Sequence, residues 1–203
     1  MKALRTKFGT YAVALLISCG FGTTMSMAGS GDFAGIYAAL NASAGGAQIS
    51  GTHTSSNNEV NEGTVGGVFP LAGYEIGFNL PIGSMFFLGV GHSWTAGGSA
   101  QIANSRGDAL GGSNADGDAA GGSHFGLEAS NLKEVYIMPS ISISDYSAVY
   151  VKLGRSIADL TATGSVTGNP GNLTGNTVGI GTIAMTEKGI FVKTEGTMTR
   201  FND

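Results

Sequence analysis

The stretch Val135-Tyr-Ile-Met-Pro-Ser-Ile-Ser-Ile-Ser144 alternates apolar side chains with mixed or polar ones. Its apolar face consists of Val135, Ile137, Pro139, Ile141 and Ile143. Asp145 marks a tight turn, after which the apolar face continues in Val149, Val151 and Leu153, opposite Tyr150 and Lys152. Alternation with a period of two on both sides of a tight turn predicts an antiparallel hairpin that has one face against an apolar medium.

The same alternation recurs along the chain. Tyr74, Ile76, Phe78 and Leu80 alternate with Glu75, Gly77 and Asn79, and Phe86, Leu88 and Val90 alternate with Phe87, Gly89 and Gly91. Seven segments follow this pattern, at about 33–49, 64–80, 83–103, 131–144, 146–163, 173–185 and 188–201. They are longer than the roughly 5 to 6 residues of ordinary strands, and their length suits strands that cross a membrane.

The connections between these segments alternate in length. Those at 81–83, 144–145 and 186–188 are tight, whereas those at 50–63, 104–130 and 164–172 are long and polar. Short turns at one rim and long loops at the other predict an all-β, antiparallel, up-and-down membrane β-barrel. We expect the long loops to be external, where they would contact any external ligand.

The predicted register assigns each strand residue to one face. Five charged residues point into the lumen and should pair there, with water, in a network that fills the barrel or acts as a selectivity filter: Glu75, Glu134, Lys152, Lys193 and Glu195. The lipid-facing set is Tyr74, Ile76, Phe78, Phe86, Leu88, Ile141, Ile143, Val149, Val151 and Leu153. Arg155 falls in the lipid-facing register too, which places it near a rim or implies a bulge.

The N-terminus resembles an export signal. Lys2, Arg5 and Lys7 precede the apolar run 11–19, which is too short for a spanning helix, and Ser26-Met-Ala28 suits signal-peptidase cleavage. We therefore expect a signal peptide at 1–28 and a barrel domain at 29–203. Leu16-Ile-Ser-Cys19 also resembles a lipoprotein processing site, and this single cysteine excludes a disulfide within one chain.

Composition excludes several functional classes. Glycine occupies 35 of 203 positions, charged residues make up 12%, and the net charge of −4 comes without a basic cluster, so no nucleic-acid partner is expected. The pair His92-Ser93 lacks an acid at triad spacing, and the loop 114–119 lacks the carboxylate that would complete a calcium site. We predict neither catalysis nor a cofactor or metal.

Four motifs resemble successive strands of the small porin-like outer-membrane β-barrel family, of the OmpA transmembrane-domain type. They are Gly73-Tyr-Glu-Ile-Gly-Phe-Asn79, Ala148-Val-Tyr-Val-Lys-Leu-Gly154, Gly175-Asn-Thr-Val-Gly-Ile-Gly181 and Phe191-Val-Lys-Thr-Glu-Gly196. The resemblance implies a barrel of eight strands in the outer membrane of a Gram-negative bacterium, and we expect the barrel to be a monomer. It also implies a role in envelope integrity, adhesion or slow diffusion of small solutes.

The chain departs from that pattern because only about seven strands are visible, and an open strand edge in lipid leaves backbone groups unpaired. We expect that the closing strand is absent after Asp203 or that the segment 83–103 is miscounted. The predicted function is a non-catalytic, porin-like protein that contacts outer-membrane lipids and has a structural, surface-interaction or narrow-pore role. The alternative is a secreted or lipid-anchored β-sandwich adhesin, since a sandwich shows similar alternation.

Overall fold

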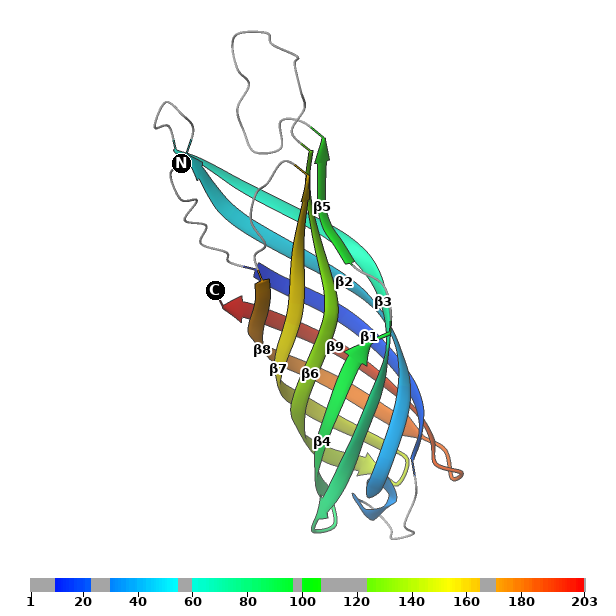
Figure 1. Ribbon diagram of the computed structural model, residues 1–203. Coiled ribbons are helices and arrows are strands. Elements are labelled where there is room, and N and C mark those ends of the chain that lie inside the picture. Colours follow the sequence, from blue (N-terminus) through cyan, green and yellow to red (C-terminus); the bar gives the residue numbers. More distant parts are fainter. Residues whose placement is uncertain are drawn as a thin grey trace.

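A computed structural model describes residues 10–22, 30–54, 60–96, 100–106, 124–164 and 171–202. These residues form an antiparallel sheet that curls into a barrel (Figure 1), so the predicted all-β, up-and-down fold is confirmed. The strands are β1 (Thr10–Gly22), β2 (Gly35–Thr54), β3 (Val60–Ile82), β4 (Phe86–Thr95), β5 (Ala100–Arg106), β6 (His124–Ser144), β7 (Ser147–Gly164), β8 (Gly171–Met185) and β9 (Ile190–Asn202). One turn of 3-10 helix, η1 (Ser30–Phe33), precedes β2.

The sheet closes on itself. β4 pairs with both β3 and β6, and β1 pairs with both β2 and β9, so the ring runs β1-β2-β3-β4-β6-β7-β8-β9 and returns to β1. The ring therefore has eight positions. The seven predicted segments occupy seven of these positions, and the eighth is β1, which lies in the segment predicted to be an export signal.

The stagger of the ring follows from the register. A path of paired residues that leaves β3 at Ile76 passes through His92, Val135, Arg155, Asn176, Arg200, Tyr11 and Gln48 and returns to β3 at Gly66. The path thus slips by ten residues in one circuit. With strands roughly 4.8 Å apart and a rise of roughly 3.3 Å per residue, this slip tilts the strands by about 40°.

The wall is interrupted at several places. The predicted segment 83–103 divides into β4 and β5, and both pair with β6, so they occupy one position in the ring. On β6, the register with β7 shifts between Ser130 and Lys133, where Asn131 has a φ of 52°. This β-bulge inserts one extra residue into β6 and reverses which face its upstream residues occupy.

The predicted short turns lie together at one rim of the barrel, at residues 83–85, 145–146 and 187–189. Gly83 and Gly189 have φ values of 75° and 76° there, which glycine adopts without strain. Residues 23–29, 107–123 and 165–170 are outside the described part of the chain, and so is 55–59. The predicted cleavage site, the loop 114–119 and the middle of each long loop fall in these ranges.

The wall has an apolar outer surface and a polar or aromatic inner one. Among the described residues, exposed Ile, Val, Leu, Phe and Tyr side chains cover the outside, while the buried side chains include glutamate, lysine, serine and threonine. No helix in the described part of the chain has the length and apolar character needed to cross a membrane.

Candidate functional site

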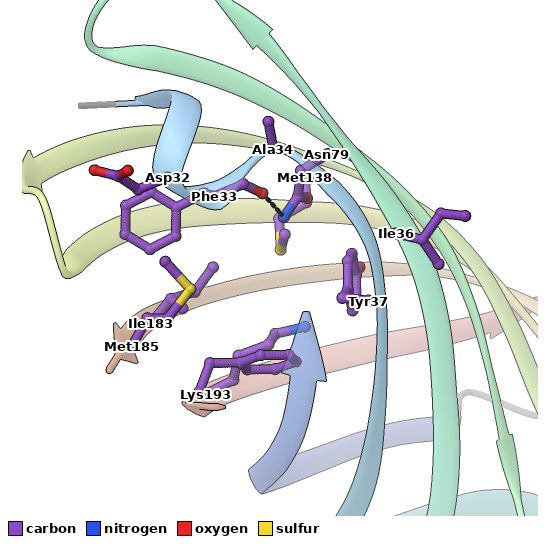
Figure 2. A pocket seen from close by; sticks show the side chains of 11 residues that line it. Asp32, Phe33, Ala34, Ile36, Tyr37, Asn79, Met138, Ile183, Met185 and Lys193 are labelled. Carbon is purple, nitrogen blue, oxygen red and sulfur yellow. Dashed lines mark hydrogen bonds between the residues drawn. The ribbon is translucent and has the colours of Figure 1, made fainter. Parts of the chain in front are cut away.

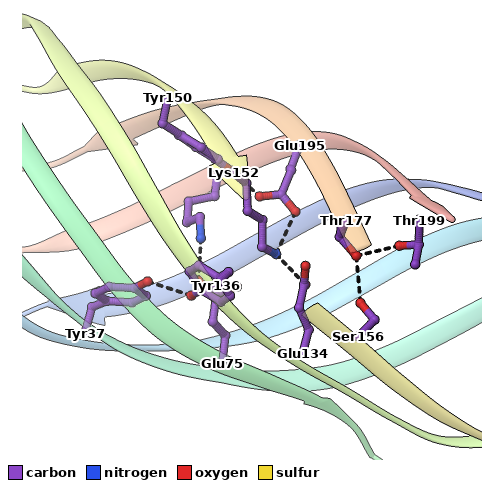
Figure 3. A network of polar contacts seen from close by, with 11 residues as sticks. Tyr37, Glu75, Glu134, Tyr136, Tyr150, Lys152, Ser156, Thr177, Glu195 and Thr199 are labelled. Atoms are coloured by element: carbon purple, nitrogen blue, oxygen red, sulfur yellow. Dashed lines mark hydrogen bonds and ion pairs between the residues drawn. The ribbon is translucent and has the colours of Figure 1, made fainter. Parts of the chain in front are cut away.

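The middle of the lumen holds a network of charged side chains (Figure 3). Lys152 on β7 forms ion pairs with Glu134 on β6 at 2.8 Å and with Glu195 on β9 at 3.0 Å. Tyr150 donates a hydrogen bond of 3.0 Å to the second carboxylate oxygen of Glu195. Three strands of the ring are therefore joined across the lumen by side chains, in addition to their backbone pairing.

A second ion pair joins the opposite walls of the barrel. Lys193 on β9 pairs with Glu75 on β3, and both side chains are almost completely buried. Beside them the hydroxyl groups of Tyr37 and Tyr136 are hydrogen-bonded at 2.6 Å. A buried charge is tolerated only when it is paired and hydrogen-bonded, and this arrangement pairs each lysine with at least one carboxylate.

Aromatic rings surround the two lysines. The Lys152 Nζ atom lies 4.3 Å from the centre of the Tyr136 ring. The Lys193 Nζ atom lies 5.4 to 5.7 Å from the ring centres of Tyr37, Tyr136 and Tyr150. The negative faces of these rings add attraction for the ammonium groups where water is scarce.

Glycines make room for the three tyrosines. Each ring lies over a glycine at the paired position of the neighbouring strand: Tyr37 over Gly77, Tyr136 over Gly91, and Tyr150 over Gly181. A Cβ atom at any of these glycines would collide with the ring. The high glycine content thus has a local cause, because large inward side chains need small neighbours in a narrow barrel.

The short-turn end of the lumen is apolar (Figure 2). Here Phe33 of η1 stacks on Phe87 with ring centres 5.1 Å apart, and Asn79 donates a hydrogen bond of 2.9 Å to the Phe33 carbonyl. A cavity of about 20 Å³ beside Phe33, Met138 and Lys193 has room for about one water molecule. η1 therefore places a buried aromatic side chain inside this end of the barrel.

Toward the long-loop end the lumen is lined by hydroxyl groups. Thr177 on β8 is hydrogen-bonded at 2.7 Å to Ser156 on β7 and at 2.7 Å to Thr199 on β9 (Figure 3). The interior is thus layered along its axis, with an apolar end, a charged middle and a hydroxyl-lined end.

The structure places the five predicted lumenal charges inside the barrel and joins them in two groups, Glu134-Lys152-Glu195 and Glu75-Lys193. Of the ten residues predicted to face lipid, nine are exposed on the outer surface and Leu88 is half-buried. The inward tyrosines of the network were not among the predicted site residues. The sequence does contain a signal for them: Tyr136 and Tyr150 alternate with outward-facing residues, which predicts that both side chains point into the lumen.

His92, of the pair His92-Ser93, lies at an outward position of β4 and pairs with Ile76 on β3. The His92 ring stacks on Trp94, with ring centres 5.2 Å apart, on the outer surface. No group of three metal-ligating side chains is found in the described ranges. At the short-turn rim, the negative charge of the Glu187 carboxylate raises the pKa of the Tyr146 phenol above its ordinary value.

Neither a protein-family model nor a curated protein sequence matches this chain.

Proposed function

We propose that this protein is a non-catalytic β-barrel of a bacterial outer membrane whose lumen is closed, and that it serves the envelope as a structural or surface-interaction protein. The observation that carries this proposal is the inverted polarity of the wall. Ile180 and Leu40 are 70% and 67% exposed on the outside, whereas Lys152 and Lys193 are 1% and 2% exposed inside. An apolar outer band around a polar interior is what a barrel needs in hydrocarbon.

The lumenal contacts favour a closed barrel over a pore. The two ion-paired groups lie between an apolar end blocked by Phe33 and Phe87 and a hydroxyl-lined end. A conducting pathway would have to break buried ion pairs, whose separated charges are strongly disfavoured. The alternative architecture, a β-sandwich, is wrong because a sandwich has two packed sheets and these strands form one closed sheet.

Refolding into lipid vesicles tests the membrane location. The full chain should insert, resist extraction by alkaline carbonate, and run on gels as a compact form that heating converts to a slower one. A chain that stays in the aqueous phase without detergent would overturn the proposal.

Conductance across a planar bilayer tests the closed lumen separately. We expect the inserted wild-type protein to pass no measurable ionic current. Steady single-channel steps from the wild-type protein would favour the narrow-pore role instead, and the membrane location would stand.

A further inference from the structure

A row of basic and amide side chains crosses the outer surface near the long-loop end. Arg155 on β7 pairs in register with Asn176 on β8, which pairs with Arg200 on β9. Arg155 also pairs with Val135 on β6, and Lys133 is the next outward-facing residue of β6. Lys133 itself pairs with Trp94 on β4. All four polar side chains are exposed, so they form one outward-facing row over four neighbouring strands.

The row lies at a boundary of the outer surface. On the short-turn side of it, the next outward residues are apolar: Leu153 and Val151 on β7, Val178 and Ile180 on β8, and Val135 and Ile137 on β6. On the other side lie the polar residues Asp159, Asn172 and Thr174, with Ile157 among them. In a membrane, such a boundary is the level at which lipid headgroups meet the acyl chains.

In the described part of the chain, neither Lys133 nor Arg155 has a carboxylate within ion-pairing distance. The outward acid nearest in register, Asp159, instead accepts a hydrogen bond of 2.7 Å from Asn131. Two exposed cations on neighbouring strands therefore favour an anion from outside the chain.

A shallow hollow in the outer surface adjoins the row. His92, Arg155 and Asn176 lie at its long-loop end, and its walls are apolar side chains that include Val90, Ile137 and Leu153. A ligand that fits both parts has an anionic headgroup and an apolar chain. That combination is the chemistry of a phosphate-bearing lipid.

We propose that this row and hollow bind an anionic membrane lipid, with its phosphate between Lys133 and Arg155 and an acyl chain along Val90, Ile137 and Leu153. The inference rests on the proposed membrane location. Trp94 is the single tryptophan of the chain and is the cross-strand neighbour of Lys133, so its fluorescence reports which lipid contacts the site.

The experiment compares quenching of Trp94 by two brominated lipids. The protein is refolded into phosphatidylcholine vesicles that contain the same mole fraction of brominated phosphatidylglycerol or brominated phosphatidylcholine. Quenching by the anionic lipid should be stronger in the wild-type protein. Arg155→Gln or Lys133→Gln should lower the preference for that lipid about fivefold each, the effect of one cation near an anionic lipid surface.

Lys188→Gln is the matched control, because it removes an exposed cation from the turn at the opposite rim. This variant should keep the wild-type preference. The heat-dependent mobility shift on gels verifies that each variant is folded, which is expected since all three side chains are exposed.

The possible results test the lipid site and the membrane location independently. Equal quenching by both lipids in the wild-type protein, or a preference that survives both substitutions in the row, overturns the lipid site and leaves the membrane location standing. Absence of quenching by either lipid in the folded protein overturns both proposals.

Discussion

Two walls of the barrel are held together in different ways. The wall formed by β6, β7 and β9 is joined across the lumen by Lys152, Glu134 and Glu195, in addition to the backbone ladder. The seam at β1 is joined to β2 and β9 through twelve paired positions on each side. At Gly20 a Cβ atom would collide with the Ala38 carbonyl oxygen, the Phe191 ring and Ala39, so only glycine fits at this inward position of the seam.

This difference separates two requirements of a barrel. Closure needs backbone pairing at every strand edge, which any strand of suitable alternation and length supplies. The filling of the lumen needs particular side chains at particular positions. β1 serves the first requirement, and β6, β7 and β9 serve both.

Removal of residues 1–28 tests the seam and should have the largest effect. The remaining strands then expose the edges of β2 and β9, and each backbone group left unpaired in hydrocarbon costs several kcal/mol. We expect residues 29–203 to lose the compact, heat-resistant gel form that the full chain gives in vesicles. If residues 29–203 gave the same form, β1 would not be needed for closure.

Moving the segment supplies the control for that deletion. β1 runs antiparallel to β9 and starts beside Phe201, near the end of β9. Residues 10–22 attached behind Asp203 by a flexible linker would enter the same gap in the same direction. This rearranged chain should recover the compact form, whereas a scrambled segment of equal composition should not.

Substitution of Lys152 by Met tests the charged wall. The change leaves Glu134 and Glu195 buried without their cation, which should destabilise the barrel by about 3 to 5 kcal/mol. Urea unfolding in vesicles measures the loss, and Glu195→Gln in the Lys152→Met background should restore part of it. Lys133→Met, on the outer surface of the same wall, should change stability by less than about 1 kcal/mol.

Arginine on the outer surface compares the two walls directly. Val151 on β7 and Ile17 on β1 are 43% and 51% exposed, and both lie well inside their strands. Arginine at either position should cost about 2 to 4 kcal/mol in vesicles, and arginine at Ile143, next to a turn, about 0 to 1 kcal/mol. A cost at Val151 without one at Ile17 would place β1 outside the wall.

The smallest expected effect comes from adding one methyl group to a glycine. Gly181→Ala forces the Cβ atom into the Tyr150 ring and should cost about 1 to 3 kcal/mol. Gly196→Ala adds the same group where nothing lies within 4 Å, so it should be neutral or stabilise by about 0.4 to 1 kcal/mol. Urea midpoints of the two variants measure the contrast, and equal values would mean that the Tyr150 ring can move aside.

The strands and their antiparallel order could be predicted because side-chain alternation has a period of two and the turns are local in sequence. Residues 10–22 were harder, because their apolar run suits two structures. It is too short for a spanning helix, yet its thirteen residues suit a tilted strand, with larger side chains at Tyr11, Val13 and Leu15 alternating with alanines. Only the unpaired edges of β2 and β9, which are tertiary features, favour the strand.

The details of the lumen could be predicted only in part. The alternation of side chains predicts that Glu75 and Lys193 both point into the lumen. They are 118 residues apart in the sequence, however, and their contact depends on the stagger of the whole ring. The contact of Tyr150 with Gly181 likewise depends on the register between β7 and β8. These registers depend on packing around the whole ring, so they cannot be predicted from the sequence of one strand.

The bulge at Asn131 has an electrostatic consequence for the lumen. Without the extra residue, Glu128 would share the inward face of β6 with Glu134, because the two are an even number of positions apart. In the structure Glu128 pairs with the exposed Thr161 and so lies on the outer side. The interior network already holds three carboxylates and two ammonium groups. One residue in a left-handed conformation thus keeps a fourth carboxylate out of the lumen, where the two lysines of the described network already pair with three.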